Sequence, residues 1–160
     1  MDGRPVLYLD LDDTLISWEG GRPHAAPGAH EFVLWALDRL EVRWLTTWCP
    51  GGVMSDSLLH DLGRMLDLPV ETLRPIRGIP WERHGSKLNG IAWLEHSVLG
   101  RPFVWLEDEY GCTGRERDFL VANRQLHCYR HCNVTEDADA LLRVHVELRR
   151  WLRQCARAVA

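Results

Sequence analysis

The stretch Val6-Leu7-Tyr8-Leu9-Asp10-Leu11-Asp12-Asp13-Thr14 places a short apolar run directly before a group of acids. Four consecutive apolar or aromatic residues predict a buried β-strand over residues 6–9. The three carboxylates come at the point where this strand ends. The chemistry available to these carboxylates therefore depends on the fold that surrounds the strand.

The remainder of the chain alternates strand-like and helix-like segments. Helices are expected over residues 28–40, 55–66, 86–98, 114–121 and 136–156, and further strands over 42–47, 70–73, 102–106 and 125–129. Strands separated by helices indicate a parallel sheet covered on both faces. We therefore expect an α/β fold, a single Rossmann-like domain over residues 1–160 with a central parallel sheet of about five strands.

The composition narrows the classes of protein. The chain has 160 residues, of which 46% are hydrophobic and 26% charged, and a net charge of −4 at pH 7. This balance gives no overall basic field for nucleic acid, and no apolar stretch reaches the roughly 20 residues of a membrane span. No signal peptide is recognisable, so we expect a cytoplasmic protein whose five cysteines are reduced thiols.

Polar side chains gather at the edge of the predicted sheet where the strands end. They follow three of the expected strands: Asp10, Asp12, Thr46, Thr47, Glu107 and Asp108. Lys87, the single lysine among 19 basic residues, begins the helix that leads into the strand over residues 102–106. Because parallel strands end at one edge, and ligands of such sheets bind there, these groups form a candidate site.

The pair Asp10 and Asp12 suits phosphoryl transfer. Two carboxylates two residues apart repel each other unless a cation or a proton lies between them, and a hard divalent cation is the natural partner. A carboxylate can also act as a covalent nucleophile, while a second acid protonates the leaving oxygen and then activates water. An isolated pair of this kind would more often be a polar turn, but here it follows a buried strand.

Together these features resemble the haloacid dehalogenase (HAD) superfamily of phosphatases. Its four motifs are an apolar strand followed by DxDx[TV], a Ser or Thr ending the next strand, a Lys near a helix start and an acidic pair after a strand. They are matched in order by residues 6–14, Trp44-Leu45-Thr46, Lys87 and Glu107-Asp108. The resemblance implies that Asp10 is the nucleophile that becomes an aspartyl-phosphate and that Asp12 is the general acid/base.

The resemblance also implies a bound Mg²⁺. Its ligands would be Asp10, the backbone carbonyl of Asp12 and one of the fourth-motif acids, either Glu107 or Asp108. The family more commonly has Asp-Asp at this fourth motif, and the Glu is a departure from that pattern. The acid at position 12 implies phosphatase or phosphotransferase chemistry rather than dehalogenation.

Contacts to the phosphoryl group are implied for hydroxyl and ammonium side chains. The hydroxyls are those of Thr14 and of Thr46, or of Thr47 if the second motif is shifted by one residue. Lys87 would offset the charge crowded between the phosphoryl group, Asp10 and the metal. A compact ammonium fits such a space, whereas the guanidinium of an arginine is a broad planar fork.

The space available for a cap domain limits the substrates. Between Asp13 and the strand over residues 42–47 there is room for one helix and the loop over residues 17–24, so a minimal cap or none is expected. An open site would admit a phosphate on a protein side chain or a nucleic acid end. Trp44-Leu45-Thr46-Thr47-Trp48 and residues 104–109 further resemble a compact HAD group associated with RNA-repair proteins.

Two alternatives to a macromolecular phosphatase remain open. A phosphorylated metabolite would need a lid, which an oligomer partner could supply. A binding or regulatory module could keep the fold without activity, although such a module has no need of the acid/base carboxylate of Asp12.

Two further residue groups have both a functional and a structural interpretation. His127-Cys128-Tyr129-Arg130-His131-Cys132, with Cys112, contains zinc ligands, but it lacks a C-x₂-C pair and overlaps a predicted strand, so core packing is favoured. Of the tryptophans, four lie in apolar patterns that predict core positions: Trp35, Trp44, Trp93 and Trp105. Three lie in expected loops around the site: Trp18, Trp48 and Trp81.

Overall fold

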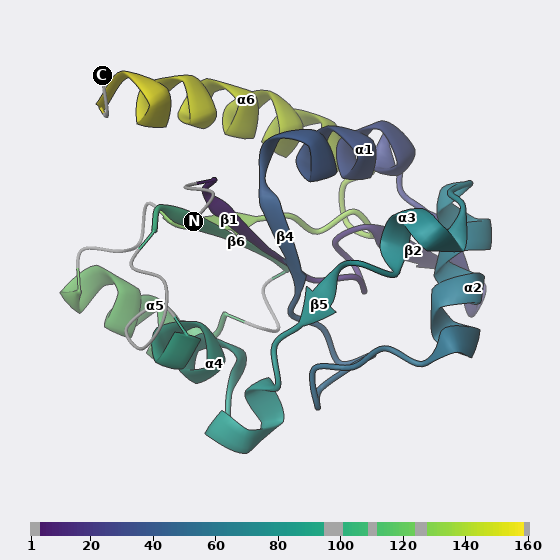
Figure 1. The fold of residues 1–160 in the computed structure, drawn as a ribbon, viewed down its shortest axis with the longest axis horizontal. Coiled ribbons are helices and arrows are strands. Elements are labelled where there is room, and N and C mark those ends of the chain that lie inside the picture. Colours follow the sequence, from purple (N-terminus) through teal and green to yellow (C-terminus); the bar gives the residue numbers. More distant parts are fainter. Residues whose placement is uncertain (1–3, 95–100, 109–111, 124–127, 159–160) are drawn as a thin grey trace.

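The computed structural model describes residues 4–94, 101–108, 112–123 and 128–158. Its centre is a five-stranded sheet in the order β5-β4-β1-β6-β7, and every neighbouring pair is parallel (Figure 1). The strands are β1 (Val6–Leu9), β4 (Glu41–Trp44), β5 (Arg77–Gly78), β6 (Phe103–Glu107) and β7 (Tyr129–His131). The expected fold, a single Rossmann-like α/β domain, is confirmed.

Helices cover both faces of the sheet. They are α1 (Ala29–Arg39), α2 (Asp56–Leu66), α3 (Val70–Leu73), α4 (Lys87–Leu94), α5 (Gly114–Ala122), α6 (Ala140–Ala158) and the 3-10 helix η1 (Trp81–His84). One buried cluster joins Leu7, Val42 and Val104 of the strands to α1, α2 and α6. The other joins Tyr8 and Trp105 to α4 and α5, because successive strand residues point to opposite faces. Figure 1 shows α1 and α6 above the sheet and α4 and α5 below it.

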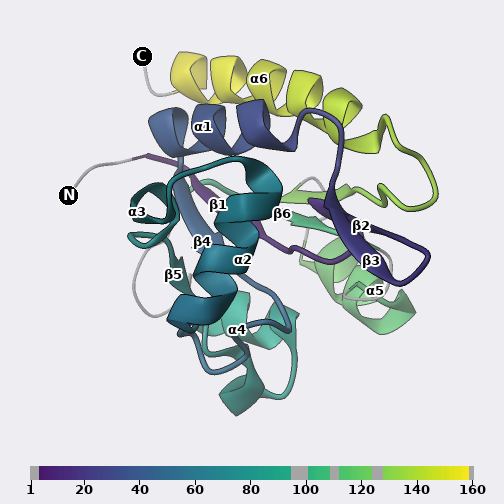
Figure 2. The same cartoon turned by 90° about the vertical axis from the view of Figure 1, so that its right-hand side faces the viewer.

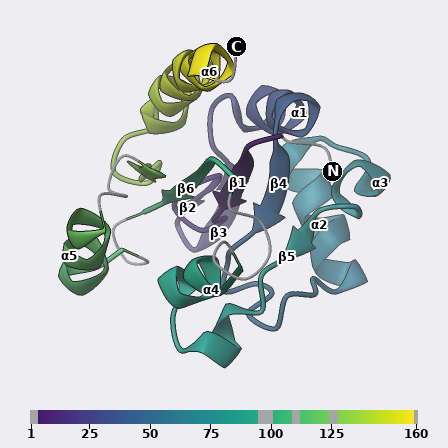
Figure 3. The same ribbon diagram turned by 60° about the vertical axis from the view of Figure 1, so that its left-hand side comes forward.

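The carboxyl ends of β1 and β6 lie side by side. Leu9 is level with Leu106 of β6 and with Trp44 of β4. From β1 the chain runs out to β4 and β5 on one side, then crosses to β6 and β7 on the other (Figure 3). The order reverses between β1 and β6, and ligands of doubly wound sheets bind in the crevice beyond such a reversal. The acids that end these two strands are therefore in the expected place.

A β-hairpin stands where a loop was expected. β2 (Ile16–Glu19) and β3 (Arg22–Ala25) pair antiparallel, and Figure 2 shows them beyond the end of β1. Gly20 and Gly21, with φ of 56° and 76°, form the two-residue turn, a backbone conformation that glycine adopts at little cost. A Gly-Gly pair between two short runs is a hairpin signal, so the sequence contained this information. In the segment between β1 and α1 the hairpin is the only regular element, which agrees with a minimal cap.

The prediction of a strand over residues 70–73 was wrong, because these residues form helix α3. Pro69 precedes them with φ −57°, which suits a helix start, and its carbonyl accepts a hydrogen bond from the backbone N–H of Thr72. The third strand along the parallel sheet is instead β5, which has two residues. A strand this short leaves no apolar run in the sequence.

Several element ends differ from the expected ones. β4 ends at Trp44 rather than at residue 47, so Thr46 and Thr47 lie in the following turn. β7 covers residues 129–131 instead of 125–129, and residues 124–127 lie outside the described part of the chain. Residues 95–98 of the helix expected over residues 86–98 also lie outside it.

Helix α6 begins at Ala140, four residues later than expected, so the acids Glu136, Asp137 and Asp139 precede the helix. Asp137 instead accepts hydrogen bonds from the Arg143 guanidinium and from the backbone N–H of Asp139, which forms a turn before the helix.

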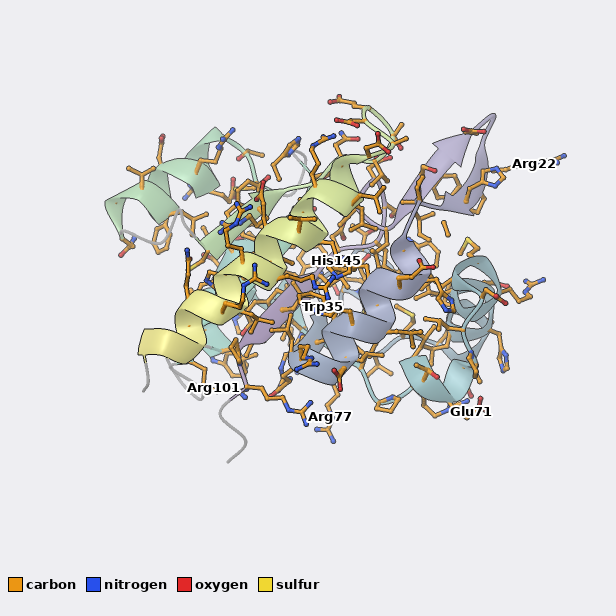
Figure 4. All side chains as sticks on the ribbon, turned by 90° about the horizontal axis from the view of Figure 1, so that it is seen from above. Arg22, Trp35, Glu71, Arg77, Arg101 and His145 are labelled. Carbon is orange, nitrogen blue, oxygen red and sulfur yellow. The ribbon has the colours of Figure 1, made fainter. Side chains whose placement is uncertain are left out.

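Helix α6 packs beside α1, where the ring of His145 contacts that of Trp35 with centroids 4.6 Å apart (Figure 4). Within the described ranges no helix, α6 included, has the length and apolar character needed to cross a membrane.

Candidate active site

The loop after β1 folds back on the carbonyl of Leu11. That oxygen accepts hydrogen bonds from the backbone N–H groups of residues 14–16. Asp13 has φ 55°, a left-handed conformation that aspartate tolerates better than most residues. The tight turn keeps Asp10, Asp12 and Asp13 along the wall of one cavity.

Asp10 is a buried carboxylate bound to an ammonium group. It is 3% exposed, and Lys87 Nζ donates a hydrogen bond to its Oδ1 over 2.8 Å. Lys87 is the first residue of α4. Ser86 caps this helix, since its Oγ accepts a hydrogen bond from the backbone N–H of Asn89. The cap and helix α4 fix the point from which the lysine reaches toward β1.

The same ammonium binds Glu107 at the end of β6. Lys87 Nζ lies 2.9 Å from Oε1 and 2.8 Å from Oε2 of this carboxylate. Trp105 Nε1 also donates to Oε2, over 3.2 Å. Glu107 is 1% exposed. Lys87 therefore bridges the ends of the two central strands, and Glu107 uses both oxygens to hold it.

Asp108 completes a cluster of three buried carboxylates. One oxygen from each of Asp10, Glu107 and Asp108 lies within 4.8 Å of the other two. Burial raises the pKa of Asp10 to about 6, against the opposing effect of Lys87. Burial and the charge of Asp10 raise the pKa of Glu107 well above its usual range. Burial alone would lower the pKa of Lys87, but the Asp10 and Glu107 carboxylates outweigh it and raise that pKa.

This donor set fits a hard divalent cation. Lys87 pairs with two of the three carboxylates, those of Asp10 and Glu107, and the three lie close enough to repel one another. Carboxylate oxygens at this spacing are the ligands that Mg²⁺ and Ca²⁺ prefer, and Mg²⁺ usually takes one or two of them and keeps several waters. Among the described residues, no other group of three or more His, Cys, Asp or Glu side chains is placed to hold a metal.

Asp12 lies in a different environment from Asp10. It is half-buried and stands outside the carboxylate cluster. Trp18 Nε1 donates to its Oδ1 over 3.2 Å, and Trp48 Nε1 donates to its Oδ2 over 2.9 Å. Thr47 Oγ1 also donates to Oδ2, over 3.4 Å. No ion pair in the described part of the chain includes Asp12, so neutral donors hold this carboxylate.

A cavity of about 390 Å³ joins these groups. Its lining includes most of the predicted site residues: Asp10, Asp12, Thr47, Lys87, Glu107 and Asp108. Trp81 also lines the cavity, which agrees with its predicted position around the site. Thr113 and Glu116, at the start of α5, are lining residues that the sequence did not suggest. Their position depends on how α5 packs, which no local motif encodes.

Two predicted phosphate contacts do not line this cavity. Thr14 is fully buried and its Oγ1 donates to the carbonyl of Cys132 over 3.4 Å. Thr46 is also fully buried, and its Oγ1 accepts a hydrogen bond from the backbone N–H of Trp48 over 3.3 Å. Of the two neighbouring threonines, it is the exposed Thr47 that faces the cavity.

A glycine lets helix α4 approach η1 closely. A Cβ added at Gly90 would lie 2.9 Å from Trp81 Cβ and 3.1 Å from Ile79 Cγ2. Neither atom is the far end of a flexible chain, so a side chain here would push the helix away. The close approach brings Lys87 and Trp81 to the same cavity. The sequence signal was a glycine inside an otherwise helical segment.

The candidate zinc ligands do not come together in the described residues. Cys112 and Cys128 belong to the buried cluster on the α4 side of the sheet, whereas Cys132 belongs to the cluster on the α1 side. His127 lies outside the described residues. The described cysteines of this group are therefore core residues, as favoured from the sequence.

The tryptophan predictions divide in a similar way. Trp44 and Trp105 are buried in the core as expected. Trp35 is half-buried, and Trp93 is 47% exposed and stacks on His84, so its core assignment was wrong. The apolar neighbours of Trp93 in the sequence belong to the inner side of α4, while its own position falls on the outer side.

Comparisons of the chain with protein-family models, with curated proteins and with solved structures find no significant match.

Proposed function

We propose that the protein is a Mg²⁺-dependent phosphatase that acts through an aspartyl-phosphate on Asp10. The observation that carries this proposal is the arrangement of Asp10, Lys87, Glu107 and Asp108 at the switch point of the sheet. Such a site pairs a nucleophilic carboxylate with a cation and with further acids that can hold a metal. The resemblance of the four sequence motifs to the HAD superfamily supports the same chemistry.

The two aspartates of the loop would share the reaction. An oxygen of Asp10 attacks phosphorus, and the bond from phosphorus to the ester oxygen breaks as the new O–P bond forms. The ester oxygen leaves with a proton from Asp12. Water then attacks the phosphorus of the aspartyl-phosphate and gives a proton to Asp12, which releases inorganic phosphate and restores the Asp10 carboxylate.

The charges of the site suit this sequence. Lys87 lies within hydrogen-bonding distance of Asp10 and would stabilise the negative charge that develops on the phosphoryl oxygens. Mg²⁺, held by Asp10, Asp108 or Glu107 and the backbone carbonyl of Asp12, would supply Lewis-acid stabilisation of the same charge. Of the three predicted hydroxyls, Thr47 is the one that lines the cavity, so it is the best placed of them to contact a phosphoryl oxygen.

The substrate is proposed to carry its phosphate on a protein side chain or a nucleic acid end. The hairpin β2–β3 is the only regular element between β1 and α1, so a phosphate on a large molecule has access to the cavity. A phosphorylated metabolite would have fewer contacts here unless a second subunit completes the site.

The test is a turnover screen of the purified chain with phosphorylated metabolites, phosphopeptides and oligonucleotides with phosphorylated ends. We expect release of inorganic phosphate from at least one class in the presence of Mg²⁺ and none with EDTA. Turnover that persists with EDTA would exclude the metal from the proposal. Absence of turnover on all three classes, by a folded protein that binds Mg²⁺, would favour a silent binding module.

A further inference from the structure

Each oxygen of Asp12 accepts a hydrogen bond from a different indole. Trp18 comes from the hairpin strand β2 and bonds Oδ1 over 3.2 Å. Trp48 comes from the turn after β4 and bonds Oδ2 over 2.9 Å. The two rings approach the carboxylate from segments separated by 29 residues of sequence. Asp12 is thus held between the hairpin and the sheet.

Indole groups are suited to hold a carboxylate that exchanges protons. An indole N–H is neutral and donates only, so it cannot take the proton from Asp12. A protonated carboxyl group keeps acceptor capacity on its oxygens, so neutral donors can hold it before and after proton transfer. Each ring is rigid with two side-chain torsions, so one bond to each oxygen restricts how the carboxylate can rotate.

We propose that Trp18 and Trp48 are positioning residues that hold the carboxylate of Asp12 at the orientation needed for proton transfer to the leaving oxygen. Together with the Asp12 carboxylate they form what we term the indole clamp. This inference rests on the proposed phosphatase function, in which Asp12 is the general acid. Through Trp18, the hairpin would then contribute to catalysis in addition to serving as a minimal cap.

A packing role alone does not account for Trp18. Its side chain is 42% exposed, so burial of the ring contributes less than for a core tryptophan. Trp48 differs, because it is half-buried and packs against the core. Trp18→Phe therefore removes the hydrogen bond with little loss of packing, and Trp48→Phe serves as a second variant. Trp93→Phe is the matched control, since Trp93 is 47% exposed and its ring stacks on His84 of η1 rather than contacting Asp12.

The clamp itself can be tested without any substrate. The eight tryptophans give indole N–H signals in a ¹⁵N-labelled protein, and the three Trp→Phe variants assign those of Trp18, Trp48 and Trp93. We expect Asp12→Ala to shift the signals of Trp18 and Trp48 and to leave that of Trp93 unchanged. Unshifted Trp18 and Trp48 signals in a folded Asp12→Ala protein would overturn the clamp.

The catalytic role can be tested by changing the leaving group. The value of kcat/KM reports the steps up to release of the leaving group, where Asp12 donates its proton. An alkyl phosphate needs that proton, whereas p-nitrophenyl phosphate releases a stable anion without it. We expect Trp18→Phe to lower kcat/KM about 10- to 100-fold for the alkyl phosphate, as general acid catalysis contributes on the order of 10² to 10⁴. For p-nitrophenyl phosphate we expect a change within about twofold.

The outcomes separate this inference from the proposed function. Equal losses on both substrates in Trp18→Phe would mean that the ring acts on structure or binding, and no loss on either would mean that its hydrogen bond is dispensable; each overturns the positioning role. Trp93→Phe is expected to change neither substrate. If the wild-type protein turns over neither these two compounds nor any class of the phosphate-release screen with Mg²⁺, the proposed function is wrong and the catalytic role fails with it, while the indole signals still decide whether the clamp exists.

Discussion

Asp10 and Asp12 are two residues apart, yet they occupy opposite environments. Asp10 is 3% exposed and is held by the ammonium of Lys87 beside two other buried carboxylates. Asp12 is half-buried and is held by two indoles and a hydroxyl. The tight turn on the Leu11 carbonyl separates them, because it ends the strand geometry after Leu9.

The difference shows how one short loop can supply two chemical roles. A nearby cation favours the ionised form of a carboxylate, as a nucleophile and a metal ligand require. Hydrogen bonds from neutral donors orient the Asp12 carboxylate, and a protonated carboxyl group keeps acceptor oxygens for such donors. Under the proposed function, the environment rather than the residue type would give Asp10 the role of nucleophile and Asp12 the role of proton donor.

The largest effect is expected from Asp10→Asn. An amide does not attack phosphorus effectively, so turnover should fall by about 10⁴-fold or more, as for the loss of other covalent nucleophiles. The melting temperature of the metal-free protein should stay the same or rise, because the variant removes one of three crowded buried carboxylates. Phosphate release and thermal unfolding measure the two effects.

The control for this variant is Asp13→Asn in the same loop. Asp13 accepts a hydrogen bond from Thr135 and lies outside the carboxylate cluster, and asparagine tolerates its left-handed backbone. Its turnover should stay within a few-fold of wild type. Near wild-type turnover by a folded Asp10→Asn protein would rule out Asp10 as the nucleophile.

The second prediction concerns the kind of charge beside Asp10. Lys87→Arg should lower turnover nearly as much as Lys87→Ala, by about 10²- to 10³-fold. In the structure one ammonium contacts Asp10 and both oxygens of Glu107, a space that a broad guanidinium does not fit. Turnover of both variants on the same substrate is the measurement. If Lys87→Arg works within a few-fold of wild type while Lys87→Ala fails, charge alone matters.

The sequence predicted the central sheet and the Asp10 half of the comparison. For the Asp12 half it placed Trp18 and Trp48 in loops around the site, but it did not predict their hydrogen bonds to Asp12. Asp10, Lys87 and Glu107 each lie at the end of a regular element or directly after one, so the fold of a parallel sheet brings them together. The indole donors of Asp12 come from a hairpin and a turn whose geometry depends on φ angles of single residues, Gly20 and Gly21 among them. Such positions carry no periodic pattern. The two-residue strand β5 was missed for the same reason.

The third prediction distinguishes the roles of Glu107 and Asp108, the two acids at the end of β6. Glu107 holds Lys87 with both oxygens, so Asp108 is the better candidate for the metal. We expect Asp108→Asn to raise the Mg²⁺ concentration for half-maximal turnover by at least 10- to 100-fold, the range seen when groups around a metal are changed. Glu107→Gln should chiefly lower the maximal rate, because it weakens the contact that holds Lys87 in place. Titration of activity with Mg²⁺ measures both, and a reversed pattern would make Glu107 the ligand.

The smallest effect is expected from Gly90→Ala, which moves Lys87 without changing any charged group. The new methyl group would lie 2.9 Å from Trp81 Cβ, so α4 must shift away from η1. Overpacking of this kind costs about 1–3 kcal/mol of stability, more than the roughly 1 kcal/mol that alanine gains over glycine in a helix. Gly114→Ala at the start of α5 is the control, because a Cβ there meets nothing within 4 Å.

The Lys87 side and the Asp12 side of the site should respond differently to this shift of α4. Since Lys87 begins α4, we expect turnover of Gly90→Ala to fall by up to about 10-fold, a fraction of the loss for removing the contact altogether. The ratio of kcat/KM between an alkyl phosphate and p-nitrophenyl phosphate should stay that of wild type, because the indole donors of Asp12 come from other segments. Thermal unfolding checks the loss of stability against Gly114→Ala. A changed ratio would show that α4 also positions Asp12, and the division of the loop into two independent environments would then be wrong.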